Sequence, residues 1–352
     1  MMILKLFLYN LSRKINKVFI LPMNYTYSFT SICDSKCKTC NIWMKNETEL
    51  TTKEWKKIIK SIGKSPYWIT ITGGNQFLRT DFNEIMKCII KYNEPNIINI
   101  PISGTLPNLV LKKIKTLLII INKYDKKTKL ILNISIDGIE KSHDKIRGVK
   151  NSFKNSIKLI EDLKLIKKKA NNLTIGTYTV ISKYNYNEFE KIKNYIINQI
   201  KPDQFGFELA ENRFEYENIN DKIIPDTKSC IKILNKCIKK NKKHMNFILN
   251  FKEFIRKKYY KYVIDILASN NKNKMDCYAG IASIQISTTG KVWQCCTKSK
   301  IMGNLRKNKY DFNKIFFSNK ANLVRKKIKM KKCFCIHSNP FYTNYICSLK
   351  IK

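Results

Sequence analysis

The first 210 residues alternate between short apolar runs and longer segments with amphipathic spacing. The short runs are rich in β-branched residues and predict six strands, at 25–31, 67–72, 97–102, 130–136, 173–181 and 204–209. The amphipathic segments predict five intervening helices, at 51–62, 81–92, 108–122, 152–169 and 188–199. Two of these helices open with an N-terminal capping pattern, Thr51 to Glu54 and Asp81 to Glu84.

This regular alternation predicts an α/β fold with a parallel sheet. The strands are nearly continuous apolar runs, which suits a sheet that is covered on both faces. Six units are too few to close an eight-fold barrel, so we expect a partial (β/α)6 TIM-like barrel with an open side. Functional sites on such sheets lie beyond the carboxyl ends of the strands.

After residue 210 the alternation stops, and the pattern divides the chain into four parts. We expect an amphipathic lead-in at 1–24, the barrel core at 25–210, a helical connector at 211–276 and a small Cys-rich α+β extension at 277–352. Charged residues interrupt the apolar start, which therefore predicts neither a membrane span nor a signal peptide. We expect a cytoplasmic protein, with a helix that lies on a membrane surface as the lesser alternative.

The chain of 352 residues carries a formal net charge of +42, from 68 basic and 26 acidic residues. Such a charge favours a polyanionic partner. Only 7 of the basic residues are Arg, however, and the Lys residues are spread over nearly every predicted helix. Abundant Lys, Ile and Asn are typical of an AT-rich genome, so we do not expect nucleic acid as a partner.

Twelve Cys residues gather mainly in two groups near opposite ends of the chain, and this pattern favours metal binding or catalysis over a disulfide framework. The first group is Cys33, Cys37 and Cys40, with the spacing C-x3-C-x2-C. Three thiolates hold a [4Fe–4S] cluster with one iron left open for chemistry, whereas structural zinc takes four protein ligands. Zinc with a distant fourth ligand, or a chance spacing, are the alternatives.

The second group is dispersed through the extension and comprises Cys277, Cys295, Cys296, Cys333, Cys335 and Cys347. A strand, a turn at Gly290 and a second strand would deliver Cys295 beside two Cys-rich loops. That arrangement predicts a metal cage, with structural zinc as the alternative. The other three Cys residues lie in predicted helices, where we expect small buried apolar side chains; they are Cys88, Cys230 and Cys237.

Several further motifs follow in order along the predicted barrel and its extension. The second strand ends in Ile69-Thr-Ile-Thr-Gly73-Gly74-Asn75-Gln76-Phe77-Leu78-Arg79, and the fourth is followed by Asp137-Gly138 and then His143-Asp144-Lys-Ile-Arg147-Gly148. The extension reads Cys277-Tyr-Ala-Gly280, Gly290-x4-Cys295, Gly303-Asn304-Leu305 and Cys333-x-Cys335. Together with the first Cys group, these motifs resemble the radical S-adenosylmethionine (radical SAM) superfamily with a C-terminal SPASM/Twitch-like auxiliary-cluster domain.

The resemblance implies specific roles. Cys33, Cys37 and Cys40 would ligate the catalytic [4Fe–4S] cluster, and SAM would chelate its open iron. The remaining cofactor-binding residues would be Gly73, Gly74, Asn75, Ser103, Ser135, Asp137 and Arg147. The two glycines would let the backbone approach the methionyl amino group, and Arg147 suits a carboxylate because its guanidinium is a planar fork. His143 lies within a matching motif, and we expect it to be structural.

The resemblance also implies one auxiliary [4Fe–4S] cluster in the extension. Its ligands would come from Cys277, Cys295, Cys333, Cys335 and Cys347, with Cys296 and His337 as alternates. The chain departs from the family pattern in having Asn75 where the family has Glu, Ser103-Gly104 after the third strand, and fewer than the full seven SPASM cysteines. Asn75 offers the ammonium group of SAM no charge, so SAM affinity is expected to be weaker.

The family pattern predicts an enzyme that reductively cleaves SAM to a 5′-deoxyadenosyl radical, which abstracts hydrogen from a substrate. A peptide or a small molecule would be the substrate, and a low-potential donor of the flavodoxin or ferredoxin type would supply the electron. Two alternatives remain: an RNA-modifying enzyme of the same family, and a non-catalytic iron–sulfur protein on a degenerate scaffold. Only the presence of Asn75 where the family has Glu supports the non-catalytic alternative.

Overall fold

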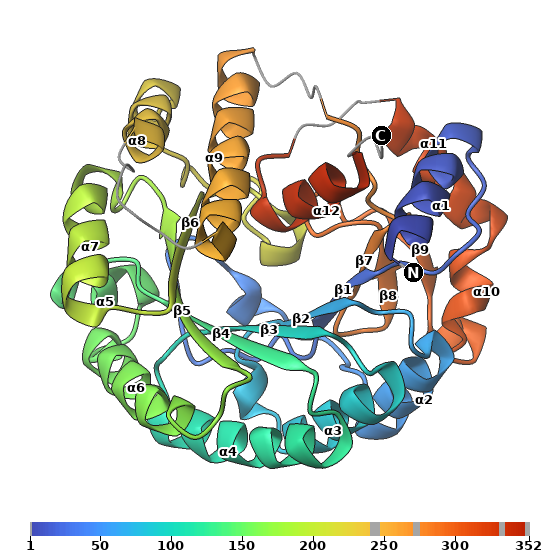
Figure 1. Ribbon diagram of the computed structural model, residues 1–352, viewed down its shortest axis with the longest axis horizontal. Coiled ribbons are helices and arrows are strands. Elements are labelled where there is room, and N and C mark those ends of the chain that lie inside the picture. Colours follow the sequence, from blue (N-terminus) through green and yellow to red (C-terminus); the bar gives the residue numbers. More distant parts are fainter. Residues whose placement is uncertain (1, 240–246, 270–274, 331–334, 349–352) are drawn as a thin grey trace.

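In this computed structural model, residues 2–239, 247–269, 275–330 and 335–348 are described, and their strands form a single sheet (Figure 1). The strand order is β6-β5-β4-β3-β2-β1-β7-β8-β9. The strands are β1 Asn24–Ser28, β2 Trp68–Thr72, β3 Ile97–Ile102, β4 Lys129–Ser135, β5 Leu173–Ile181, β6 Gln204–Leu209, β7 Ser283–Ile286, β8 Lys291–Trp293 and β9 Ile301–Asn304. Strands β1 to β6 are parallel neighbours, as the alternation predicts, and they curve into a partial barrel.

Helices surround the outside of this curved sheet (Figure 1). Those of the barrel are α2 Thr52–Ile62, α3 Phe82–Asn93, α4 Pro107–Tyr124, α5 Lys141–Arg147, α6 Ser152–Lys167 and α7 Phe189–Tyr195. The others are α1 Met2–Ile15, α8 Thr227–Lys239, α9 Phe247–Ala268, α10 Phe312–Phe316, α11 Asn319–Lys329 and α12 Ser338–Ser348. The five predicted barrel helices are present, whereas the short α5 was not predicted. It ends at Gly148, whose φ of +68° is the left-handed conformation that glycine adopts easily.

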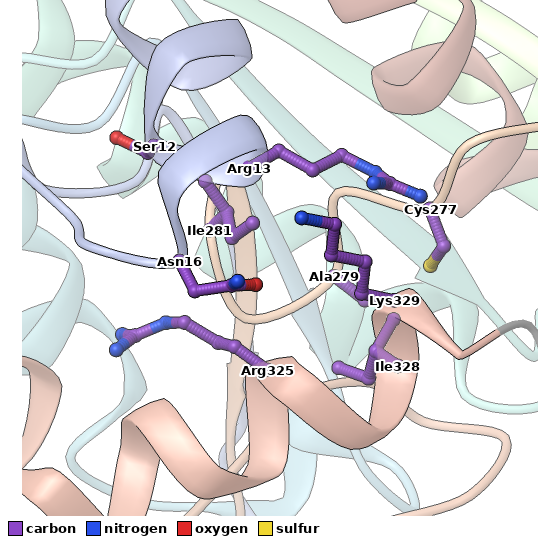
Figure 2. Close-up of a pocket in the computed structure, with 9 residues that line it drawn as sticks. All are labelled: Ser12, Arg13, Asn16, Cys277, Ala279, Ile281, Arg325, Ile328 and Lys329. Carbon is purple, nitrogen blue, oxygen red and sulfur yellow. The ribbon is translucent and has the colours of Figure 1, made fainter.

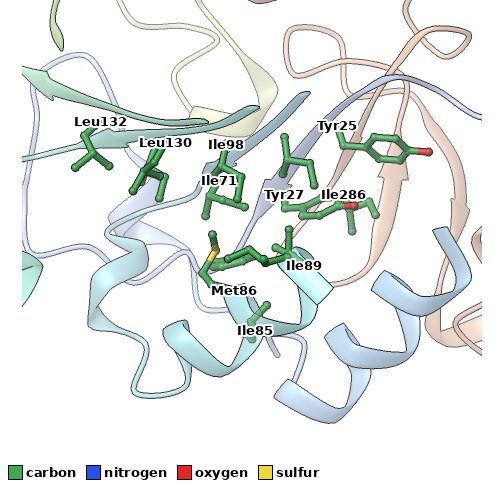
Figure 3. Packing of buried hydrophobic residues seen from close by; sticks show 14 of the residues in the cluster. Tyr25, Tyr27, Ile71, Ile85, Met86, Ile89, Ile98, Leu130, Leu132 and Ile286 are labelled. Carbon is green, nitrogen blue, oxygen red and sulfur yellow. The ribbon is translucent and has the colours of Figure 1, made fainter. Parts of the chain in front are cut away.

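The two faces of the barrel sheet differ in polarity, although the strands read as nearly continuous apolar runs in the sequence. Residues on the outer face are apolar and pack against the helices, as Figure 3 shows for Tyr27, Ile71 and Ile98 above α3. The inner face carries polar side chains instead. Asn133 donates to Asn99 at 2.7 Å and accepts from Gln204 at 3.1 Å, which links β3, β4 and β6 across the inside.

Helix α2 illustrates how local sequence builds the outer layer. Thr51 and Glu54 form the predicted capping box, and Gly63 ends the helix with a φ of +61°. The apolar stripe of the helix buries Trp55 completely, with its ring 5.5 Å from the ring of Tyr27 and 5.2 Å from that of Phe29. Burial of such rings is worth about 1.5–3 kcal/mol each, which fixes α2 against β1.

The Cys-rich extension joins the barrel sheet directly. Strand β7 pairs in parallel with β1, with Asn24 opposite Ser283, and β8 and β9 continue the sheet in antiparallel order. The predicted hairpin around Gly290 is present, whereas β9 was not predicted. Helix α12 lies across the open side of the barrel (Figure 1), where Thr343 accepts from the side chain of Asn24 at 2.7 Å.

An arginine of the extension holds the loop that leads into α2. The guanidinium of Arg306 donates to both carboxylate oxygens of Glu54, at 2.7 and 3.1 Å, and to the backbone carbonyls of Thr48 and Glu49. The hydrogen bonds from Arg306, helped by those from the backbone and side chain of Thr51, lower the pKa of Glu54 from 4.5 to about 2. This contact therefore stabilises the fold at neutral pH and weakens in acid.

The variant Arg306→Ala tests the contact between Arg306 and Glu54. Because the folded-state pKa of Glu54 lies below its unfolded value, the stabilisation is present above about pH 4.5 and is lost as the pH falls towards 2. We expect Arg306→Ala, prepared without an iron–sulfur cluster, to lose about 1 kcal/mol of unfolding free energy at pH 7, because the Arg306–Glu54 pair is partly exposed. Urea unfolding followed by circular dichroism should show that the difference in unfolding free energy between variant and wild type becomes smaller below pH 4.5. A difference that stays constant with pH would contradict the role given to the Arg306–Glu54 contact.

Candidate functional site

The predicted Cys triplet lies in the loop that follows β1, at the carboxyl edge of the sheet. Backbone hydrogen bonds fix this loop from several directions. The N–H of Lys38 donates to Ile146 of α5 at 2.9 Å, and that of Cys40 to Cys37 at 3.2 Å. The N–H of Asn41 donates to Tyr216 at 2.9 Å. The loop is therefore held by elements more than a hundred residues away.

The three thiols are close enough to affect one another electrostatically. Burial, together with the charge of Cys37, raises the pKa of Cys33 to about 11 and that of Cys40 to about 12. No three His, Cys, Asp or Glu side chains in the described residues already stand at metal-bonding geometry. A metal would therefore draw these thiols together and displace their protons.

The Gly73-Gly74 turn after β2 lies directly against the Cys loop. The N–H of Gly74 donates to the carbonyl of Thr30 at 2.6 Å, and the N–H of Asn75 donates to Ile32 at 2.8 Å. A Cβ on either glycine would come within 2.3 Å of a backbone oxygen of that loop, and Gly73 has a φ of +135°. Glycine is thus required here by the protein's own backbone, irrespective of any ligand.

Two further predicted residues, Asn75 and Ser103, are linked through Asp34, which lies between Cys33 and Cys37 in the sequence. Asn75 donates from Nδ2 to Asp34 Oδ1 at 2.8 Å, and its Oδ1 accepts from the N–H of Phe77 at 3.1 Å. Asp34 Oδ2 accepts from Thr105 Oγ1, which lies 2.9 Å from Ser103 Oγ. Asp34 therefore joins the ends of β1, β2 and β3.

The loops after β4 bring Asp137 and Arg147 to the same edge. Arg147 Nη1 donates to Asp137 Oδ2 at 3.2 Å, and its charge counteracts the burial that raises the pKa of Cys33 and Cys37. Its Nε is buried and has no hydrogen-bond partner in the described part of the chain. Ser135 is half-buried on β4, opposite Tyr178 of β5. Arg147 thus keeps a buried donor beside the thiols.

His143 is a structural residue, as expected. Its ring is fully buried, Nδ1 accepts from the N–H of Asp137 at 3.1 Å, and Nε2 lies 3.2 Å from Ser152 Oγ. Burial, together with the charge of Arg147, lowers the pKa of His143 to about 3. The imidazole is therefore neutral and holds Asp137 in place.

Sequence reasoning missed the segment 210–223, which follows β6 and returns to the Cys loop. Asn218 Nδ2 donates to the carbonyl of Thr39 at 2.8 Å. Arg213 is buried and binds Glu208 at 3.2 Å, Glu211 at 3.3 Å and the hydroxyl of Tyr216 at 3.2 Å. The polar run directly after β6 was the available signal, since it occupies the same strand-end position as the other sites.

Three of the predicted auxiliary residues lie together beside this segment. Burial raises the pKa of Cys335 well above its usual value, and the charges of Glu211, Cys296 and Cys295 raise it further, which places these groups near one another. His337 Nδ1 lies 2.8 Å from Glu208 Oε2 and 3.1 Å from Arg213. The imidazole thus belongs to a buried charge network.

Two other auxiliary candidates have different surroundings. Cys347 is fully buried on α12, and burial raises the pKa of its thiol to about 12. Burial, together with the nearby Cys347, also raises the pKa of Tyr9 and Tyr278. Cys277 lines a small cavity of about 10 Å³ beneath α1 and α11 (Figure 2), which is room for about one water molecule. Cys333 lies outside the described residues.

Comparison with known proteins identifies the barrel. A radical SAM superfamily model matches residues 27–196, which include the Cys loop, the glycine turn and Arg147. The barrel is therefore a radical SAM domain. Members of this superfamily are enzymes that use a [4Fe–4S] cluster and SAM. In the described residues, no helix is long and apolar enough to cross a membrane.

The chain is also similar to individual relatives. The antilisterial bacteriocin subtilosin biosynthesis protein AlbA of Bacillus subtilis is 24% identical over 304 residues, which cover 83% of this chain and 59% of AlbA. Streptococcus suis SuiB bound to precursor peptide SuiA has a TM-score of 0.61 at 14% identity, over 97% of this chain and 79% of SuiB. Native anSMEcpe with bound AdoMet and Cp18Cys peptide has a TM-score of 0.59 at 14% identity, over 89% of this chain and 86% of that one.

The site residues of this radical SAM domain fit the cofactors of the superfamily. Three thiols share one loop and form no disulfide with one another, which matches a cluster with one open iron. Arg147 keeps a buried Nε without a partner in the described residues, and this donor suits an anionic ligand. The donor chemistry of the site thus agrees with the family.

The substitution Gly74→Ala tests the contact between the glycine turn and the Cys loop. Its Cβ would lie 2.3 Å from the carbonyl oxygen of Ile32, so the loop must shift. We expect iron bound after anaerobic reconstitution to fall by at least about half, as measured by a colorimetric iron assay. The matched control is Thr80→Ala, an exposed position near the end of the same β2–α3 connection. Full iron loading in Gly74→Ala would refute the steric argument.

Proposed function

We propose that this protein is a radical SAM enzyme that cleaves SAM and uses the resulting radical to abstract hydrogen from a peptide. One observation carries the proposal: the loop that bears Cys33, Cys37 and Cys40 lies at the carboxyl edge of a partial barrel, directly against the Gly73-Gly74 turn. The fold and the superfamily agree with it.

Each residue at this edge has a task in the proposal. Cys33, Cys37 and Cys40 hold the cluster, which when bound supplies the electron that cleaves SAM to a 5′-deoxyadenosyl radical. Gly73 and Gly74 keep the backbone of β2 close to the Cys loop and open to the methionyl end of SAM. Arg147, oriented by Asp137, offers its free Nε to the carboxylate or ribose of SAM. Ser103 and Ser135 present further polar groups at the ends of β3 and β4.

The inner face of the barrel supports a peptide substrate. It carries hydrogen-bonding side chains such as Asn99 and Asn133, which suit the amide groups of a backbone. Two similar structures, SuiB and anSMEcpe, are recorded with peptides bound. AlbA takes part in the biosynthesis of a bacteriocin. A small-molecule substrate remains the second choice, because a radical formed in a barrel is not specific to one class.

We further propose one auxiliary [4Fe–4S] cluster in the extension, held by Cys277, Cys295, Cys333 and Cys335. Cys296, expected as an alternate, lies near Cys335 and replaces Cys347 among the favoured ligands, because Cys347 packs near Tyr9 and Tyr278. His337 binds Glu208 through Nδ1, which leaves Nε2 as an alternate ligand. A low-potential donor of the flavodoxin or ferredoxin type, in the cytoplasm, would deliver the electron for both clusters.

The first test is anaerobic SAM cleavage. Protein reconstituted with iron and sulfide is mixed with SAM and dithionite, and 5′-deoxyadenosine is measured by mass spectrometry. We expect wild type to form it. The triple variant Cys33→Ala/Cys37→Ala/Cys40→Ala should lose all cleavage and about four irons, which is one cluster.

The control for this experiment is Cys230→Ala, whose thiol is buried in α8. It should retain both iron and activity. If wild type holds iron but makes no 5′-deoxyadenosine even with candidate peptides present, the enzymatic proposal fails in favour of a non-catalytic iron–sulfur protein.

The auxiliary site is tested separately with the double variant Cys295→Ala/Cys335→Ala. We expect it to lose about four of about eight irons. It should still cleave SAM, because Cys33, Cys37 and Cys40 are unchanged, while turnover of the peptide falls. An unchanged iron content in this variant would remove the auxiliary cluster from the proposal.

A further inference from the structure

Asp34 is a carboxylate that forms no ion pair with any cationic side chain in the part of the chain that the structure describes, although the protein is strongly basic. Other acids in the same strand-end loops are neutralised: Glu49 and Asp81 pair with Arg79, at 3.3 and 2.7 Å, and Asp137 pairs with Arg147 at 3.2 Å. Among the described residues, Asp34 receives hydrogen bonds only from the neutral side chains of its partners on the β2 and β3 loops. Its negative charge is thus held in place and left uncompensated.

The partners of Asp34 fix where this charge lies. Asn75 Nδ2 donates to one carboxylate oxygen and Thr105 Oγ1 to the other, so the group is oriented from two sides. Thr105 is itself buried and 2.9 Å from Ser103 Oγ. Asp34 stands between the proposed ligands Cys33 and Cys37, and its charge acts on both thiols. A fixed anion beside a cluster site is placed to receive a cationic group.

Asn75 cannot take this role. It stands where the family pattern has a glutamate, but its amide carries no charge, and its Nδ2 and Oδ1 are already engaged by Asp34 and by the N–H of Phe77. The distance of 2.8 Å between Asn75 and Asp34 means that the chain has a carboxylate within one hydrogen bond of the expected position.

We propose that Asp34 is the residue that binds the α-ammonium group of SAM, in place of the acid missing at position 75. The inference rests on the proposed function, since it assigns a residue to SAM binding at that site. Asn75 then serves as a positioning residue that holds Asp34. The site then keeps one negative charge near the expected position. The residue that carries this charge lies on the Cys loop and not on the loop after β2.

The test measures binding, independently of turnover. Equilibrium dialysis of reconstituted protein, under anaerobic conditions, gives the Kd for SAM and for a deamino analogue that lacks the α-ammonium group. We expect Asp34→Asn to weaken SAM binding about tenfold or more, because a charge-assisted hydrogen bond is lost. The affinity for the deamino analogue should stay unchanged, as should the iron content.

A second experiment moves the carboxylate from position 34 to position 75. The double variant Asp34→Asn/Asn75→Glu returns one carboxylate to the same corner and should recover most of the SAM affinity. Asn75→Glu alone should bring no gain, because two adjacent carboxylates repel each other. Exposed Glu84→Gln on α3 removes one negative charge elsewhere and should leave SAM binding at the wild-type value.

The outcomes separate the inference from the proposed function. If Asp34→Asn binds SAM as tightly as wild type, or weakens both ligands equally, Asp34 does not bind the ammonium group. If Asp34→Asn loses its iron and the double variant does not regain it, the carboxylate is only a structural tie, and the inference is overturned. A wild-type protein that binds iron but no SAM would overturn the proposed function as well.

Discussion

The contact between two backbones, the Gly73-Gly74 turn and the Cys loop, determines the geometry of the whole site. A Cβ on Gly74 would come within 2.3 Å of the oxygen of Ile32, so these chains can be this close only because the side chain is absent. The approach brings Asn75 to Asp34, and Asp34 in turn holds Thr105. Three strand ends thereby act as one unit around the thiols.

The barrel can support such a site because the two faces of its sheet carry different kinds of side chain. Apolar side chains on the outer face, such as Tyr27, pack against apolar side chains of the helices, such as Trp55 of α2. The inner face is free to carry Asn and Thr side chains. The extension completes this design, because β7 continues the sheet from β1 and α12 covers the open side. The fold is therefore rigid on the outside and polar within.

The segment 210–223 connects the two Cys-rich regions. Through Tyr216 and Asn218 it binds the backbone of the Cys loop, and through Arg213 it binds Glu208, the partner of His337. Buried ion pairs of this kind are weak contributors to net stability but costly to break on one side only. Their value here is positional, because they fix the spacing between the thiols after β1 and those of the extension.

Local pattern in the sequence determined the six barrel strands, the capping box of α2 and the grouping of Cys33, Cys37 and Cys40, because periodicity and spacing act over a few residues. It also identified Arg147 and the glycine turn through motifs. Only the tertiary structure decided that Asp34 meets Asn75, that β7 pairs with β1 and that Cys347 lies apart from Cys335. The first two are contacts between residues 41 and more than 250 positions apart, and such pairs are selected by packing and hydrogen bonding across the folded chain, which no local pattern encodes.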